Sequence, residues 1–464
     1  MFRCLFALLL IVSQASVYSQ SPVPSPAQRS WHDTEFYLFC HFGPNTFTNI
    51  EWGHGTETED LFHPTDLDCD QWCRIARQAG ARGIVITAKH HDGFCLWPSK
   101  YSTHTVRESK WKAGKGDVLR ALSDACHRHG LKFGVYLSPW DRNHPQYGTP
   151  TYNDVYVSTM TELMTQYGEL FEFWWDGANG EGPNGKKQVY DFHRYEQAAA
   201  RLQPNAVIFS DIGPGCRWVG NERGIIETET NWCTLDTAGF VRGAGSPPMD
   251  TLNQGNINGK HWIPAECDVS IRPGWFYHPE EDDKVKTPEQ LWDIYLHSVG
   301  RGANLILNVP PDRRGRFSPQ DSVSLVALGQ KIRSAFNNNL ALKKKCYTYG
   351  EVVYVGKLRT KALTDGDRNT GIGMSIKRGV VIDLKKKKTF NTILIREYIA
   401  DGQQIGAFTV EIWKKNAWQE IARSNTIGAR KIISFPEVEA RKLRVMVRSA
   451  KAAPKLSEVE VYKW

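Results

Sequence analysis

The feature that most constrains the fold is an alternation of short apolar runs with longer amphipathic segments through residue 309. The apolar runs are residues 36–42, 83–89, 133–138, 171–176, 207–211, 225–230, 261–268 and 304–309. Helical periodicity lies between several of them, over residues 68–79, 116–129, 153–167, 187–202 and 288–300. Such alternation is typical of a parallel sheet with crossover helices. Eight strands predict an α/β fold with a (β/α)8-type barrel, irregular where the later crossovers are weakly helical.

The pattern changes after the charged tract Lys343–Lys345. Apolar and polar residues then alternate with a period of two, without helical segments, over residues 380–384, 392–398, 408–413, 442–447 and 459–464. This pattern is typical of an all-β sandwich. We therefore predict a barrel domain over residues 20–340 and a C-terminal β-sandwich domain over residues 341–464. A chain of 464 residues is long enough for two hydrophobic cores.

The two predicted domains differ in charge. Residues 341–464 hold 26 Lys and Arg against 12 Asp and Glu, a net charge of +14, so the rest of a chain whose total is +8 carries −6. A basic module suits polyanions or acidic glycans. However, the sequence has no nucleic-acid-binding signature, and the basic residues are scattered over alternating strands. We interpret them as solvated surface and expect no nucleic-acid partner.

Residues 1–19 have the organisation of a secretory signal peptide. Arg3 precedes the apolar run Leu5–Val12, and small residues follow up to Ser19. We expect export to the periplasm or the extracellular space, or to the lysosome or apoplast if the source is eukaryotic. No later stretch approaches the roughly 20 apolar residues of a transmembrane helix. Nine cysteines follow the signal peptide, at spacings that indicate mostly buried thiols with a few bridges.

Functional groups of such a barrel lie at the carboxyl ends of its strands. Four predicted strands end in aromatic, imidazole and carboxylate groups: His41 with Glu51 and Trp52; His90, His91 and Asp92; Tyr136 and Asp141; and Asp176. Aromatic rings stack on the C–H faces of a sugar, while fixed donors and acceptors bind its hydroxyls. The sequence has no Walker-type phosphate loop and no dinucleotide fingerprint. These patterns indicate a sugar ligand and no cofactor.

The cluster His90, His91 and Asp92 has two other interpretations. It could bind a metal ion, or its histidines could only satisfy hydrogen bonds within the barrel. Neighbouring residues of a strand point to opposite faces, so two adjacent histidines rarely bind one ion unless the strand has ended. We therefore expect no metal site.

At these positions the sequence resembles the α-L-fucosidases of glycoside hydrolase family 29, in particular the branch that acts on α-1,3/4-linked fucose. The resemblance is colinear over about residues 30–335. The matching stretches are His41–Gly43, Glu51–Gly53, Thr87–Phe94, Gly134–Arg142, Trp174–Ala178, Arg217–Glu222 and Arg272–His278. It implies a retaining exo-α-L-fucosidase acting on a fucosylated oligosaccharide or glycoprotein glycan through a covalent fucosyl-aspartate.

The resemblance also implies roles for individual residues. Asp176 corresponds to the nucleophile and Glu222 to the acid/base, with Glu227, Glu229 and Glu266 as physically possible alternatives to Glu222. The fucose pocket would be formed by His41, Glu51, Trp52, His90, His91, Tyr136 and Trp275. The C-terminal domain resembles discoidin-like or fucosidase-associated sandwiches, and we expect it to support the barrel.

Three other hypotheses are compatible with the sequence. The protein could be a broad-specificity α-L-fucosidase, a fucose-binding protein without catalysis, or an adhesion protein that works through the basic sandwich. Intact Asp176 and Glu222 argue against the second hypothesis. The sequence does not fix the oligomeric state or the natural substrate.

Overall fold

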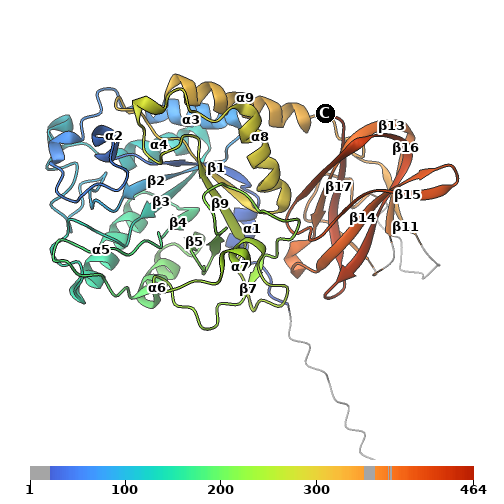
Figure 1. Ribbon diagram of the computed structural model, residues 1–464, viewed down its shortest axis with the longest axis horizontal. Coiled ribbons are helices and arrows are strands. Elements are labelled where there is room, and N and C mark those ends of the chain that lie inside the picture. Colours follow the sequence, from blue (N-terminus) through green and yellow to red (C-terminus); the bar gives the residue numbers. More distant parts are fainter. Residues whose placement is uncertain (1–20, 350–360, 375, 377–378) are drawn as a thin grey trace, which may run out of the picture.

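The computed structural model describes residues 21–349, 361–374, 376 and 379–464, so the predicted signal peptide lies outside the described residues. A barrel and a β-sandwich lie side by side (Figure 1). The barrel is closed, with strand order β1-β10-β9-β6-β5-β4-β3-β2. Its strands are β1 (Phe36–Cys40), β2 (Gly83–Lys89), β3 (Lys132–Leu137), β4 (Glu172–Trp174), β5 (Val207–Ser210), β6 (Cys216–Trp218), β9 (Ala265–Ser270) and β10 (Asn304–Asn308). All neighbours pair in parallel, which confirms the predicted barrel.

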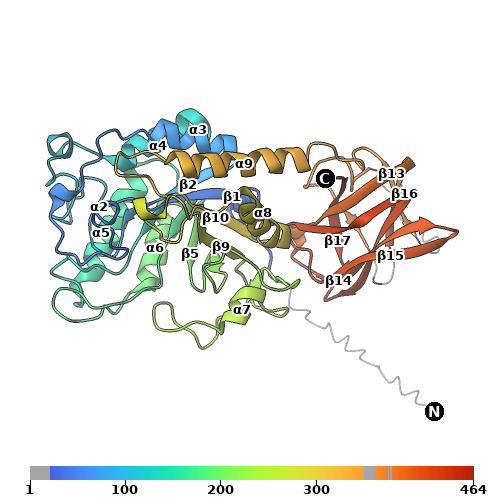
Figure 2. The ribbon, with the colours of Figure 1, turned by 45° about the horizontal axis from the view of Figure 1, so that its top comes forward.

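Helices cover the barrel, and several begin at an aspartate that caps the first turn. The Asp68, Asp117 and Asp191 carboxylates accept hydrogen bonds from backbone amides that would otherwise lack a partner. The helices are α1 (Pro26–His32), α2 (Asn45–Thr48), α3 (Cys69–Ala79), α4 (Val118–His129), α5 (Thr151–Gln166), α6 (Phe192–Leu202), α7 (Met249–Gln254), α8 (Pro288–His297) and α9 (Pro319–Ala335). The last helix runs toward the sandwich (Figure 2). Across the described residues, no helix is long and apolar enough to cross a membrane.

The prediction for the sixth barrel strand was wrong. Residues 225–230 form no strand, and the sixth position is taken by β6, which pairs with β5 and β9. The link from β5 to β6 is a tight turn without a helix, and a Cβ at Gly215 would lie 2.5 Å from the Ile208 nitrogen. The apolar residue Ile226 is buried outside the barrel, where its amide donates to the carbonyl of His297 at the end of α8. Burial of Ile226, and not strand pairing, explains the apolar start of this run.

The C-terminal part is an antiparallel sandwich, as predicted. Its strands are β11 (Lys345–Tyr349), β12 (Ile372–Gly373), β13 (Gly379–Glu397), β14 (Ile405–Lys414), β15 (Ala417–Ser424), β16 (Lys431–Ala450) and β17 (Lys455–Tyr462). They follow the order β12-β17-β13-β16-β14-β15, with β11 paired to β13. A register shift between Asp383 and Lys388 interrupts the pairing of β13 with β16, and such a shift bends long strands. The inward side chains form a separate apolar core.

All nine cysteines among the described residues are buried free thiols. The expected disulfide bridges are therefore not formed there. The thiols act as small apolar side chains in the two cores, as the interpretation of buried cysteines predicts.

Glu35, just before β1, joins the barrel to the sandwich. Its carboxylate accepts hydrogen bonds from Arg396 at 2.8 Å and from Arg430, both on the sandwich and both buried. Burial alone would raise the pKa of Glu35, but the Arg430, Arg396 and Arg368 guanidinium groups lower it to about 2. One buried carboxylate and two buried guanidinium groups thus meet at this joint. Removing either kind of group would leave the other with a buried charge that lacks its main counter-charge.

We predict that Glu35→Ala lowers the free energy of unfolding by about 3–5 kcal/mol, because it removes the buried carboxylate that pairs with both Arg396 and Arg430. The control Asp33→Ala, which removes a more exposed ion pair with Arg368, should cost about 1 kcal/mol or less. In the wild type, the Glu35 contribution should be full above its ordinary pKa of 4.5 and be lost as the pH falls toward 2. Denaturant titrations at several pH values measure both effects; equal losses in the two variants would contradict the account.

Candidate active site

Side chains from four consecutive strands converge at the carboxyl end of the barrel. His41 follows β1, His90 and His91 follow β2, Tyr136 lies on β3, and Asp176 follows β4. The rings of His41 and His90 are 5.7 Å apart, and His90 stacks on Tyr136 at 5.8 Å. The structure therefore brings together five of the residues that the sequence singled out, at the end of the barrel where active sites of this fold lie.

The Asp176 carboxylate has donors on both oxygens. Oδ2 accepts a hydrogen bond of 3.0 Å from the Tyr136 hydroxyl, and Oδ1 accepts one of 2.7 Å from the Ala178 amide. The His91 Nε2 atom lies 3.8 Å from Oδ2. The side chain is a quarter exposed, so one face of the carboxylate is open toward solvent. This arrangement fixes the direction of an accessible anionic oxygen.

The three histidines beside this carboxylate are buried and favour the neutral form. Desolvation lowers the pKa of His41 to about 4, lowers that of His90 well below its usual value, and lowers that of His91 despite the nearby Asp176 charge. His41 Nδ1 lies 2.9 Å from Asn308 Oδ1, and His91 Nδ1 lies 2.8 Å from Ser138 Oγ. Neutral imidazoles offer both a donor and an acceptor, which suits hydroxyl groups.

Glu51 organises the opposite wall through a loop that carries Trp275. Its carboxylate accepts hydrogen bonds from the backbone amides of Trp275 at 2.9 Å and Phe276 at 3.3 Å, and His278 Nε2 lies 2.5 Å away. Burial would raise the pKa of Glu51, but these hydrogen bonds lower it. The Trp275 ring then lies 5.1 Å from His41. Glu51 acts on the wall of the pocket through the Trp275 loop.

Trp52 lies at the rim of the site. Its side chain is 55% exposed, and it meets His91 and Trp140 edge-on at ring distances of 5.9 Å. An exposed indole face at this position can stack on a sugar ring.

The four candidate acid/base glutamates occupy different environments. Glu222 is an exposed residue near Trp275 whose carboxyl is partly shielded from solvent. This partial desolvation and the Asp176 and Glu51 charges raise its pKa, while a hydrogen bond with Trp275 opposes the shift. Glu227 is exposed and paired with Arg223. Glu229 is bound to the sandwich through Lys431 at 2.9 Å, which, against burial, helps lower its pKa to about 2. Glu266 is enclosed inside the barrel.

Two carboxylates that the sequence singled out at strand ends support the loops and do not face the site. Asp92 is fully buried and accepts hydrogen bonds from Asn45 at 3.1 Å and the Phe94 amide at 2.6 Å. Asp141 is buried and forms a salt bridge of 2.8 Å with Lys89. Both are structural.

One carboxylate beside the site was missed. Asp211 directly follows β5, and burial together with the Asp176 charge raises its pKa to about 6. A Cβ at Gly177 would lie 2.2 Å from Asp211 Oδ2, so only glycine fits next to Asp176. The signal was present, because Asp211 closes an apolar run in the same way as Asp176 does.

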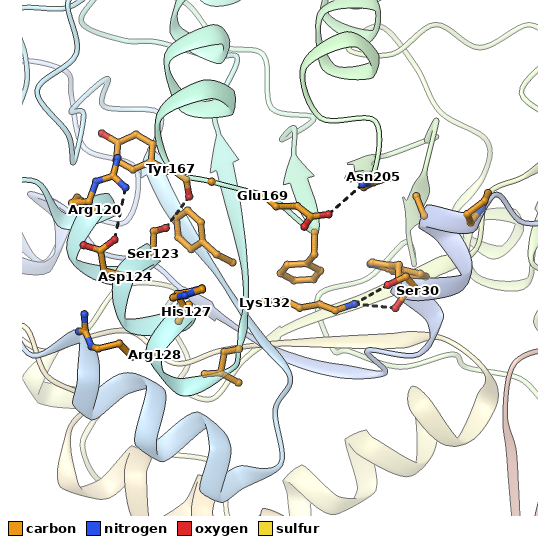
Figure 3. Close-up of a pocket in the computed structure, with 18 residues that line it drawn as sticks. Ser30, Arg120, Ser123, Asp124, His127, Arg128, Lys132, Tyr167, Glu169 and Asn205 are labelled. Carbon is orange, nitrogen blue, oxygen red and sulfur yellow. Dashed lines mark hydrogen bonds and ion pairs between the residues drawn. The ribbon is translucent and has the colours of Figure 1, made fainter. Parts of the chain in front are cut away.

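A wide cavity of about 960 Å³ lies at the other end of the barrel. Figure 3 shows it between α4, the starts of β3 and β4, and α1, with Lys132 directed toward Ser30. Its Arg120, Asp124 and Glu169 side chains form hydrogen bonds or ion pairs with neighbouring residues. The converging histidines and Asp176 are not part of this cavity, so the candidate site remains at the carboxyl end.

Potential metal ligands also lie away from the histidines. In the part of the chain that the structure describes, the one group of three His, Cys, Asp or Glu side chains close enough to hold an ion is Glu172, Cys216 and Glu266, inside the barrel. The cluster His90, His91 and Asp92 does not have that geometry.

Comparisons with known proteins agree with this geometry. The α-L-fucosidase family model matches residues 47–334, and a NedA-like, galactose-binding domain model matches residues 362–445. An Arabidopsis thaliana relative named α-L-fucosidase 1 is 39% identical over 462 residues, covering 95% of this chain and 87% of its own.

Two solved structures are similar over nearly the whole chain. A glycoside hydrolase 29 family member from an unknown rumen bacterium is 41% identical with a TM-score of 0.83, covering 96% of this chain and 77% of that one. A Ruminococcus gnavus family 29 fucosidase in complex with fucose is 30% identical with a TM-score of 0.84, covering 95% of each chain. The chain therefore belongs to the α-L-fucosidases of glycoside hydrolase family 29.

Proposed function

We propose that the protein is a retaining exo-α-L-fucosidase in which Asp176 is the nucleophile. The observation that carries this proposal is the accessible Asp176 carboxylate, oriented by Tyr136 and Ala178 beside neutral histidines. Asp176 would attack the anomeric carbon and form a fucosyl ester, and water would then hydrolyse the ester. Two displacements at the same carbon retain its configuration.

Glu222 is our choice for the acid/base. A general acid needs a raised pKa, and burial with the Asp176 and Glu51 charges raises that of Glu222. Glu229 is held at the sandwich with a lowered pKa, and Glu266 is sealed inside the barrel. In the first step Glu222 would protonate the leaving oxygen. Esterification removes the Asp176 charge, which lowers the Glu222 pKa and lets it deprotonate the attacking water.

The other pocket residues would bind fucose without adding charge. His41, His90 and His91 would exchange hydrogen bonds with its hydroxyls, and Trp275 and Tyr136 would contact its apolar faces. Glu51 would hold the Trp275 loop in place. A pocket enclosed by buried side chains favours a terminal sugar and therefore exo action.

Asp176→Asn should lower kcat by on the order of 10⁴-fold or more, since it keeps the shape of the side chain but removes the nucleophile. In Asp176→Gly, azide should restore turnover and give a fucosyl azide of inverted configuration. Kinetics with an activated aryl fucoside and NMR of the product check both statements. Near-wild-type turnover of Asp176→Asn would exclude this residue as the nucleophile.

The pH profile should report Glu222. Because its pKa is raised, Glu222 keeps its proton to a higher pH than an ordinary glutamate, and kcat/KM should fall as the pH rises through that value. Glu222→Ala should lose this alkaline limb and slow natural glycans far more than aryl fucosides with good leaving groups. Glu227→Ala, which changes an exposed neighbour, is the matched control. If Glu222→Ala lost the same fraction of activity on natural glycans and on aryl fucosides, another residue would be the general acid.

We further propose that the substrate is α-1,3- or α-1,4-linked fucose on a branched, Lewis-type glycan. Trp52 supports this proposal, since its exposed indole at the rim offers a platform for a second sugar arm. Binding of that arm would orient the scissile bond and raise turnover. Asp141 and Arg217 lie in the matching stretches Gly134–Arg142 and Arg217–Glu222. Both side chains are buried, so they do not face such an arm.

A Lewis trisaccharide should have a higher kcat/KM than an α-1,2-fucosyl disaccharide or an aryl fucoside. Trp52→Ala should reduce kcat/KM on the trisaccharide while leaving the aryl fucoside much less affected. Steady-state kinetics on the three substrates measures this preference. Equal or better hydrolysis of the α-1,2 and aryl substrates would favour the broad-specificity alternative.

We propose that the sandwich, residues 341–464, supports a catalytic domain of residues 20–340 after export and removal of residues 1–19. The contacts of Glu35 and Glu229 with sandwich cations support this role.

A further inference from the structure

Two glutamates lie inside the barrel, below the active site, and the mechanism above does not use them. Glu172 on β4 and Glu266 on β9 both have no solvent exposure. An oxygen of each and the Cys216 sulfur lie within 4.8 Å of one another. Two ionised carboxylates at this separation in a dry core would repel strongly, so the barrel must neutralise one of them.

The hydrogen bonds of the two glutamates are unequal. Glu266 accepts on both oxygens, from the Tyr37 hydroxyl and, at 2.7 Å, from the Trp174 indole nitrogen. Glu172 Oε1 lies 3.8 Å from the Cys216 thiol, and no donor reaches its Oε2 among the described residues, which leaves the Glu266 carboxylate as the group that can accept a proton from Glu172. Glu266 therefore has the surroundings of a carboxylate, whereas Glu172 has those of a neutral acid.

The cationic side chains on the strands around the two glutamates bind groups other than these carboxylates. The Lys132 ammonium on β3 binds Ser30 and Thr34 outside the barrel. The Arg217 guanidinium on β6 binds the carbonyls of Leu252 and Ile263.

The remaining groups on these strands supply no positive charge either. Tyr37 on β1 and Cys216 on β6 are neutral donors with pKa values raised by burial. On β9, Asp268 lies two residues after Glu266, and burial raises its pKa as well. On β10, Asn304 donates to the Trp31 carbonyl of α1. A proton, and not a salt bridge, is left to neutralise one of the two acids.

We propose that Glu172 stays protonated in the working enzyme and that Glu266 is the carboxylate that positions Trp174 beneath the active site. Burial raises the pKa of both glutamates, but hydrogen bonds oppose the shift at Glu266, whereas the adjacent Glu266 charge adds to the shift at Glu172 and raises its pKa well above the usual range, which supports this division. Glu172 and Trp174 lie on one face of β4, and Asp176 is the next residue of that alternation, just after the strand, so the pair lies at the base of the residues that face the site.

Trp174 connects the pair to the reacting carboxylate. Its indole stacks on Phe209 at 3.7 Å and on Tyr136 at 5.4 Å, and the Tyr136 hydroxyl donates to Asp176. A shift of the indole would therefore move the donor that orients Asp176. Glu266 is a positioning residue in this account, which rests on the proposed role of Asp176.

The test compares isosteric variants. Glu266→Gln should lower kcat roughly 10- to 100-fold with a much smaller change in KM, because an amide cannot accept both hydrogen bonds. If Glu266→Gln folds poorly, Trp174→Phe is the second variant, because it keeps an aromatic ring but removes the indole donor. It should likewise lower kcat far more than it changes KM. Glu172→Gln, a neutral replacement for a neutral acid, should keep kcat within about twofold. Tyr136→Phe combined with Glu266→Gln should lose no more than the worse single variant, since both act on Asp176.

Infrared spectroscopy tests the proton without relying on catalysis. At a pH where exposed carboxyls are ionised, the infrared difference spectrum between the wild type and Glu172→Gln should contain the carbonyl stretch of one buried carboxylic acid, and the difference spectrum between the wild type and Trp174→Phe should not. Absence of this band from the first difference spectrum would overturn the proposal. The proposal would also be overturned if the purified enzyme contained one equivalent of bound metal. The same holds if the kcat losses of Tyr136→Phe and Glu266→Gln were additive in the double variant. If the band behaves as expected but Asp176→Asn stays active, the proposed nucleophile is wrong and the protonated pair is not.

Discussion

Two hydrogen bonds hold the Asp176 carboxylate at the rim of the barrel, one from the Tyr136 hydroxyl and one from the Ala178 amide. Tyr136 is placed by its packing between Trp174 and His90, deep in an aromatic interior. The direction of one carboxylate thus depends on how the whole barrel packs. This explains why the site is built from strand ends, which are rigid, and why the interior has so many rings.

Charge is distributed unevenly in the molecule. Near Asp176 the polar groups His41, His90 and His91 favour their neutral forms, so the reacting anion meets hydrogen-bonding groups and not cations. Buried ion pairs support the loops and the joint with the sandwich, where Glu35 meets two arginines. A neutral pocket suits an uncharged sugar, and the ionic joint ties the two domains together.

The sequence predicted the barrel and the convergence of His41, His90, Tyr136 and Asp176, because strand periodicity places such residues at one end. It could not show that Asp141 pairs with Lys89, since that pairing depends on how the end of β2 lies against the loop after β3.

Two further errors have physical causes. An apolar segment such as residues 225–230 has the same composition whether it pairs in the barrel or packs outside it. Asp211 was not predicted as part of the site although it directly follows β5, because its closeness to Asp176 depends on how two neighbouring strand ends meet in the fold. The unequal environments of Glu172 and Glu266 required the three-dimensional structure, as they depend on hydrogen bonds between strands distant in sequence.

The most direct test of the central claim is to trap the covalent intermediate. A 2-deoxy-2-fluoro-fucosyl fluoride slows both steps but keeps a good leaving group, so the enzyme should accumulate the fluorofucosyl ester. Mass spectrometry of the digested protein should find one added sugar on the peptide that contains Asp176. Labelling of another carboxylate, or rapid turnover to a product of inverted configuration without any adduct, would contradict the account.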